Sequence, residues 1–268
     1  MKLLKKCYQI IIICFLLLLT SCSTSFYSVE QIISNNKLYV VTNAEFAPFE
    51  YKEGKVLRGI DIDIIKEYGN YLGVEVVITD TDFDSTLVSV STNKADLAIA
   101  AITRNEKREK NFLFSDSYYS ASQVMIVRDD SKYLSCSSVE ELLDEVSNDK
   151  IKIGCQRGTT GQYYIEGSSD WDFEGISNST CVMFDNGSVA VKALSNGQID
   201  GVIIDLLPAQ MYCKKFSNVK IVDLVLVEEE YAIAINKKNT SLKESLDNFI
   251  NKIKMDGTLE SIVEVYYE

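Results

Sequence analysis

The chain has 268 residues and 46% of them are hydrophobic, so it can bury the core of one large domain or of two ordinary ones. Its formal net charge is −12, which argues against nucleic-acid binding, because nucleic-acid-binding domains carry a basic face. It contains no histidine, which excludes histidine-based triads, histidine metal ligands and the usual near-neutral general base.

The first 21 residues predict an export signal. Three lysines precede the apolar run Ile10–Leu19, which is too short to span a bilayer. The run ends in Leu-Thr-Ser-Cys, which resembles a bacterial lipobox and implies cleavage before Cys22 and lipidation of its thiol, for example with palmitate. An ordinary signal peptide or an uncleaved anchor is the alternative. Cleavage removes three lysines and leaves 24 basic and 39 acidic residues, a net charge of −15.

The segment 22–36 is polar and rich in Ser and Asn, so we expect a lipid anchor and tether there. Four cysteines follow it, namely Cys136, Cys155, Cys181 and Cys213. They allow three full disulfide pairings, among which the sequence does not choose. Cys155 lies in an apolar run, which favours a free buried thiol there. No CxxC spacing occurs, so we expect no metal site.

Short apolar runs alternate with helical patterns through the first half. The runs that predict strands are Leu38–Val41, Val74–Ile78, Leu97–Ile102 and Ala121–Val127. Between the first two, apolar residues recur at helical spacing from Ile60 to Leu72, and Gly73 ends this helix. This strand–helix–strand order predicts a layered α/β fold with parallel strand pairing.

The same alternation continues in the second half. Ser138 with Glu141 forms a capping-box pattern, and Gly158–Gly161 opens a further helix. The predicted strands are Ile151–Cys155, Cys181–Phe184, Gly201–Ile204, Val219–Val222 and Tyr231–Ile235. The last predicted helices are Ser241–Met255 and Leu259–Tyr266. Two α/β units of about a hundred residues each are the natural division.

Six motifs follow one another between residues 38 and 267. They are Asn43–Tyr51, Gly59–Asp63, Asp96–Thr103 continuing to Arg108 and Phe114–Asp116, Gly154–Gly161, Asn196–Asp205 and Lys254–Leu259. In this order they resemble the type II periplasmic binding proteins, in particular the polar amino-acid-binding subfamily of ABC importers (bacterial solute-binding protein family 3).

The resemblance implies an α/β fold of two lobes, joined by two hinge strands, with the ligand cleft between them. Lobe 1 is expected at residues 37–121 plus 229–268 and lobe 2 at residues 124–226. The crossings are expected near Ser120–Val124 and Val227–Tyr231. The implied protein captures a free, polar L-amino acid in the cell envelope, is anchored to the membrane through Cys22, and hands its ligand to the permease subunits of an ABC importer. We expect a monomer without a cofactor, and no catalysis.

An amino acid carries a carboxylate and an ammonium group, and a dry site must pair both charges. Arg108 suits the carboxylate, because guanidinium offers a bidentate fork. Asp205 suits the ammonium, because it follows a buried strand, and ligands of α/β sheets gather at the carboxyl ends of strands. The alternatives are a solvated helix charge for Arg108 and an N-cap for Asp205. The family motifs favour ligand contact for both residues.

Three further residues are implied to hold the carboxylate. Thr103 begins a capping-box pattern with Glu106, so a helix N-terminus would offer N–H groups to an anion. The resemblance adds the backbone of Ala101 and, from the other lobe, Thr160. A plain strand-to-helix turn is the alternative for the segment around Thr160. Ala100-Ala101 replaces the commoner Ser-Gly of the family, which removes a side-chain hydroxyl.

Five residues match family positions that face the ligand's side chain. Phe46 and Phe83 pack on its aliphatic stem in the family, although lone aromatics are more often core residues. Asn43, Glu45 and Gln156 stand where relatives vary, and they suggest a polar ligand without naming it. Glu45 would select a cation or lie on the surface.

Two functions of other classes share this scaffold. An enzyme such as a cyclohexadienyl-type dehydratase would use a bound carboxylate and a spare acid such as Glu45. The sequence carries no second motif of catalytic type. A sensory lobe that signals through a partner chain is the other alternative.

Overall fold

The structure is a computed structural model that describes residues 26–266. The predicted signal peptide, residues 1–21, and the predicted lipidation site Cys22 lie outside the described residues. Over residues 26–266, no helix combines the length and the apolar character that a membrane crossing needs.

One end of the molecule, which we call lobe 1, is built on a five-stranded sheet. Its strands, in order across the sheet, are β5 (Glu75–Asp80), β1 (Lys37–Thr42), β6 (Leu97–Ala98), β14 (Ala234–Asn236) and β7 (Phe112–Phe114). Its helices are α2 (Val29–Asn35), α3 (Ile60–Leu72), α4 (Phe83–Ser91), α5 (Glu106–Glu109), α10 (Thr240–Met255) and α11 (Thr258–Glu264). A small sheet adds β2 (Glu45–Phe46), β3 (Glu50–Glu53) and β4 (Val56–Arg58). Strand β1 pairs in parallel with β5 and β6, as the alternation of strands and helices predicts.

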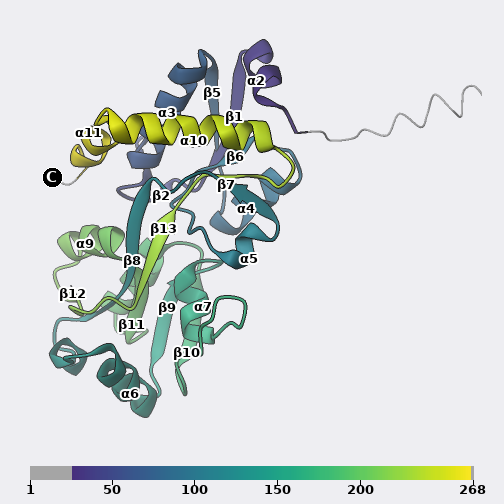
Figure 1. Cartoon of the computed structure of the whole chain (residues 1–268). Coiled ribbons are helices and arrows are strands. Elements are labelled where there is room, and N and C mark those ends of the chain that lie inside the picture. The colour runs from purple at the N-terminus through teal and green to yellow at the C-terminus, as the bar shows by residue number, and fades with distance from the viewer. Residues whose placement is uncertain (1–25, 267–268) are drawn as a thin grey trace, which may run out of the picture.

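The other end, lobe 2, is built on a six-stranded sheet (Figure 1). Its strands are β10 (Thr180–Phe184), β9 (Lys152–Gln156), β11 (Gly201–Asp205), β8 (Tyr119–Arg128), β12 (Val219–Ile221) and β13 (Val227–Tyr231). Its helices are η1 (Lys132–Ser135), α6 (Val139–Asp149), α7 (Thr160–Glu166), α8 (Gly187–Ser195) and α9 (Leu206–Lys215). All five residues of β11 are buried, which explains its unbroken apolar run.

Two long segments join the lobes. Strands β8 and β13 run antiparallel side by side, with Glu229 opposite Ala121, and both lead from one lobe toward the other (Figure 1). The predicted fold class, two α/β lobes joined by two strands, is confirmed. The residue limits of the lobes stay a prediction, because β8 and β13 pass through both proposed crossings without a break.

Helix α2 lies in the segment that we expected to be a tether. The Ser28 hydroxyl accepts from the backbone N–H of Gln31, and the Gln31 side-chain oxygen accepts from the backbone N–H of Ser28, which makes a complete capping box. Ile32 is fully buried. The Asn239 side chain also donates to the Tyr27 carbonyl at 2.8 Å. The folded part of the chain therefore begins ahead of the first strand, and the expectation of a tether up to residue 36 was wrong for α2.

Two predicted strands are shorter than expected. The run Leu97–Ile102 is a strand only over Leu97–Ala98, because Ala101 takes a left-handed conformation with φ 47°. The run Tyr231–Ile235 is divided between β13 and β14, because the chain changes sheets there. Uniform burial of an apolar run does not reveal such breaks.

Candidate functional site

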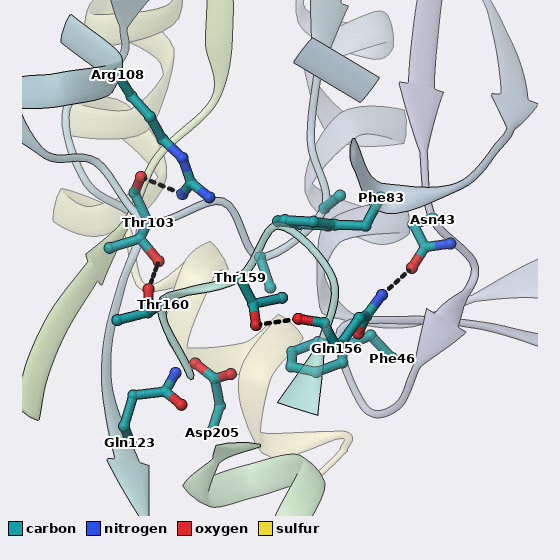
Figure 2. A pocket seen from close by; sticks show the side chains of 12 residues that line it. Asn43, Phe46, Phe83, Thr103, Arg108, Gln123, Gln156, Thr159, Thr160 and Asp205 are labelled. Carbon is teal, nitrogen blue, oxygen red and sulfur yellow. Dashed lines mark hydrogen bonds between the residues drawn. The ribbon is translucent and has the colours of Figure 1, made fainter. Parts of the chain in front are cut away.

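A small cavity lies between the lobes, against the connecting strand β8 (Figure 2). Twelve residues line it: Asn43, Phe46, Phe83, Ala100, Ala101, Thr103, Arg108, Gln123, Gln156, Thr159, Thr160 and Asp205. Nine of them are among the ten predicted ligand-binding residues. The tenth, Glu45, is exposed and accepts from the Asn186 side chain, which places it on the surface, one of the two alternatives for this residue.

Arg108 is a buried cation at one end of the cavity. Only 7% of it is exposed, which rules out the solvated helix charge. Its Nη1 donates to the Thr103 carbonyl at 2.6 Å and its Nη2 to the Gly158 carbonyl of lobe 2 at 3.2 Å. Burial lowers the pKa of Arg108 to about 10, and the charge of Glu229 opposes this shift. The guanidinium therefore stays charged at neutral pH.

Thr103 does not cap a helix, which corrects the predicted capping box. Helix α5 is capped by Asn105, whose side chain accepts from the Arg108 amide at 2.9 Å. With four residues, α5 is also too short to offer an anion a helix N-terminus. The Thr103 hydroxyl instead lies 3.2 Å from the Thr160 hydroxyl (Figure 2). It also donates to Glu229 at 3.2 Å. Thr103 and Thr160 thus meet across the cleft.

Asp205 ends β11 and faces the cavity from lobe 2. It occupies the N-cap position of α9 but makes no capping bond with its side chain. Its carboxyl accepts from the Tyr231 hydroxyl instead. Burial, and then the charge of Glu229, raises the pKa of Asp205 well above its ordinary value. A positive group that entered the cavity would oppose both causes, because it stabilises the charged carboxylate.

Glu229 is a site residue that the sequence analysis missed. It is 6% exposed and accepts from the Gln123 amide at 2.8 Å as well as from Thr103. Glu228 and Glu230 on either side of it are exposed. The alternation of burial along β13 turns Glu229 and Tyr231 inward, and the predicted crossing at Val227–Tyr231 was the signal that could have found them.

The backbone of Ala101 is already engaged. Its N–H donates to Asp61 Oδ2 at 2.7 Å. Ala101 lines the cavity, and the role of its backbone in holding the ligand's carboxylate stays a prediction.

The opposite end of the cavity is neutral and polar. The Gln156 Nε2 donates to Asn43 Oδ1 at 3.0 Å across the cleft, and Asn43 Nδ2 donates to the Thr81 carbonyl at 2.9 Å (Figure 2). Phe46 and Phe83 line the same region. Both amides are almost fully buried, so the lobes are closed on each other in this structure.

Outside the cavity, an acidic groove leads along the connecting strands. Its carboxylates are Glu106, Glu109, Asp170, Asp172, Glu228, Glu229 and Glu230. Arg104 and the aromatic side chains of Trp171 and Phe173 also line it. Among residues 26–266, no group of three or more cysteine or acidic side chains is arranged to hold a metal ion.

Comparisons with known proteins agree on one family. Residues 38–268 match the model of the bacterial extracellular solute-binding proteins, family 3. The arginine-binding extracellular protein ArtP of Bacillus subtilis is 25% identical over 95% of this chain and 94% of its own. The structure of the ABC transporter substrate-binding protein AbpA from Streptococcus pneumoniae, bound to L-arginine, is 31% identical over 88% of this chain and 97% of its own, with a TM-score of 0.78.

The ancestral amino-acid-binding protein AncCDT-1, described as a precursor of cyclohexadienyl dehydratase, is 25% identical. It covers 90% of this chain and 99% of its own, with a TM-score of 0.79. The same scaffold is thus found in the ancestry of an enzyme.

Proposed function

Because the chain belongs to family 3 of the bacterial extracellular solute-binding proteins, we propose that it captures a free amino acid between its lobes and delivers it to an ABC importer. The observation that carries the proposal is the pair Arg108 and Asp205. One is a basic and the other an acidic residue, they come from different lobes, and both line one buried cavity.

The two charges suit a zwitterion. The guanidinium of Arg108 pairs with the ligand's carboxylate, and the hydroxyl of Thr160 donates to the same group. The Thr103 hydroxyl joins them when it exchanges its bond to Glu229 for one to the ligand. The ammonium pairs with the carboxylate of Asp205, with Glu229 adding negative potential nearby. A buried charge is stable only when it is paired, so an uncharged ligand of the same size would leave both residues unpaired.

The neutral end of the cavity receives the ligand's side chain. Phe46 and Phe83 offer flat apolar faces, and the amides of Asn43 and Gln156 offer both donors and acceptors. A side chain with a planar polar end fits this lining, so L-arginine and L-glutamine are the first ligands to test. To bind, such a side chain separates the amides of Asn43 and Gln156 and replaces the bond between them.

A thermal-shift screen tests the proposal. Purified protein without residues 1–22 is heated with each of the twenty amino acids, with cystine and with ornithine. A ligand at about 100 times its dissociation constant adds about 2.7 kcal/mol to the free energy of unfolding. The proposal expects such a shift for at least one amino acid, followed by a measured dissociation constant in calorimetry. No shift with any of them would contradict it.

The proposed location is the outer face of a membrane, with a lipid on Cys22 as the anchor, and the proposed state is a monomer. Family membership supports the extracytoplasmic location, and the lipobox pattern supports the anchor. Replacement of Cys22 by Ala is expected to release the protein from the membrane fraction. Retention of the variant in membranes would contradict the lipid anchor.

We also propose that the protein is not an enzyme. The relatives that we report are described as binding proteins, apart from the link of AncCDT-1 to a dehydratase. Incubation with arogenate and prephenate is expected to give no product, and any turnover that depends on Arg108 would overturn this part of the proposal.

A further inference from the structure

A group of buried polar side chains lies behind the cavity wall, in lobe 1. Asp61 is fully buried in the first turn of α3, and Glu50 in β3 is 1% exposed. Tyr118 is 4% exposed. Asp61, Glu50 and Tyr118 act on one another, because burial, and then the charge of Asp61, raises the pKa of both Glu50 and Tyr118. A buried polar cluster costs stability unless its members pair well, so the contacts that the cluster makes are informative.

A hydrogen bond joins this group of side chains to the cavity wall. Asp61 Oδ2 accepts from the Ala101 N–H at 2.7 Å. Ala101 has φ 47°, a left-handed conformation in which the Cβ of a non-glycine residue crowds its own backbone. Backbone strain of this kind persists only where the surroundings enforce it, and it gathers at functional sites.

The local chain fixes Asp61 for this contact. Gly59 precedes α3 with φ 126°, and a Cβ there would lie 2.1 Å from the Phe49 carbonyl oxygen. Only glycine allows the backbone to come so close to Phe49, and this places the first turn of α3 directly behind the cavity wall. The amide of Asp61 donates to the same Phe49 carbonyl at 2.9 Å.

The strained segment is continuous with the charged end of the site. Ala100 and Ala101 line the cavity, and Thr103 follows two residues later. The Thr103 carbonyl accepts from Arg108, and its hydroxyl meets Thr160. A change of conformation at Ala101 would therefore shift the groups that face a ligand's carboxylate.

We propose that Asp61 is a positioning residue of the ligand site, which holds Ala101 in its left-handed conformation and thereby fixes the cavity wall from Ala100 to Thr103. Glu50 supports this arrangement from behind. Burial, and then the charge of Asp61, raises the pKa of Glu50 well above its ordinary value, which favours the neutral form of Glu50 beside Asp61. This inference rests on the proposed function, because it concerns the same cavity.

The test compares Asp61→Ala with a matched control. Asp96 is also a buried carboxyl of lobe 1 that accepts from a backbone amide, that of Tyr39, at 2.8 Å, but it is not part of the cavity lining. L-Arginine and L-glutamine are the probes in calorimetry. Asp61→Ala is expected to weaken binding by roughly tenfold, in line with the cost of a left-handed alanine. Asp96→Ala is expected to lower the melting temperature and leave the dissociation constant unchanged.

A double variant separates positioning from general damage. Glycine takes a positive φ without a steric penalty, so Ala101→Gly in the Asp61→Ala background is expected to recover most of the lost affinity. A merely destabilised core would not recover by this change. Wild-type affinity in Asp61→Ala, an equal loss in Asp96→Ala, or no recovery in the double variant would overturn the inference.

Hydrogen exchange of the Ala101 amide tests the positioning role of Asp61 separately from amino-acid binding. It needs no ligand, and it is expected to be slow in the wild type and fast in Asp61→Ala. If the wild type bound no amino acid at all, the proposed function would fail. An Ala101 amide that exchanged equally slowly in wild type and Asp61→Ala would overturn the positioning role.

Discussion

At the level of single residues, the burial of Arg108 makes binding selective for ligands that carry a carboxylate. Its guanidinium is fixed by two carbonyls, one from each lobe, and it lies 5.1 Å from the centre of the Trp171 ring. Two carbonyls carry no full negative charge, and within residues 26–266 no carboxylate forms an ion pair with this guanidinium. A ligand carboxylate supplies a counter-ion, which makes binding sensitive to this side chain.

Replacement of Arg108 by Ala is expected to weaken amino-acid binding by at least about 2 kcal/mol, because it leaves the ligand's carboxylate buried without a partner. Calorimetry with the amino acid that binds the wild type measures the loss. Arg104 is the matched control, because it is nearby but partly exposed and paired with Glu109 at 2.6 Å. Arg104→Ala is expected to change affinity little, and equal losses in both variants would contradict the assigned role.

Ligand binding is expected to release a proton from Asp205. Its pKa is raised in the ligand-free cavity by burial and by Glu229, and the ammonium of a ligand favours the charged carboxylate. The pKa therefore falls on binding, a proton is released, and affinity rises with pH until the free protein is ionised at this site. Below that range affinity decreases as pH decreases.

Calorimetry in buffers of different ionisation enthalpy measures the released proton. Asp205→Asn is expected to bind more weakly and to release no proton from this position. An affinity that is constant with pH, with no proton exchanged in any buffer, would show that Asp205 is already ionised before the ligand arrives.

The sequence predicts part of the site at this scale. Arg108 and Asp205 stand in motifs whose order implied their roles, and both line the cavity. Glu229 was hidden in a run of three glutamates, because only its strand alternation and its pairing with β8 turn it inward. The contact between Ala101 and Asp61 joins residues 40 positions apart, which no local pattern reveals.

At the scale of elements, strands β9 and β10 bring two thiols together. Cys155 and Cys181 lie on neighbouring parallel strands with their sulfur atoms 3.4 Å apart, and the cysteines from residue 136 onward are free in this structure. The sequence left three pairings open, and Cys155 is fully buried as expected. The packing of the strands brings these two cysteines together.

Mild oxidation with diamide is expected to join Cys155 to Cys181, since a disulfide needs sulfur atoms about 2.05 Å apart and a small shift supplies it. The closed loop is long enough for a gain of about 3 kcal/mol in the free energy of unfolding. Peptide mapping without reduction identifies the bond, and Cys181→Ser is the control that prevents it. A bond from Cys155 to Cys136 or Cys213 would contradict the strand register.

Among the elements, long periodic helices and buried strands were predicted well, as α3 and β11 show. Helix α2 was missed, because a short Ser- and Asn-rich segment resembles a linker in the sequence. The sequence does not show that Ile32 is buried in the core. The division of Tyr231–Ile235 was missed for a related reason. An apolar run reports burial, whereas the point at which the chain changes sheets depends on the partner strands.

At the scale of the molecule, charge is concentrated beside the cleft. The groove along the connecting strands carries seven carboxylates and one arginine, on a chain of net charge −12. Lys107 and Lys110 reach across the cleft toward Asp170, at 3.5 and 3.6 Å, so part of this negative charge also helps to hold the lobes together. The groove concentrates cations near the cavity, and salt screens this effect.

Screening by salt separates the two candidate ligands. If L-arginine binds, its association rate is expected to fall as ionic strength rises, because its net positive charge is attracted to the groove. L-Glutamine has no net charge and is expected to show little dependence. Trp171 is the single tryptophan and lines the groove, so stopped-flow fluorescence follows both reactions. The double variant Glu228→Gln with Glu230→Gln removes two exposed groove charges and leaves Glu229 in place. It is expected to reduce the salt dependence for L-arginine alone, and equal salt dependence for both ligands would contradict steering by the groove.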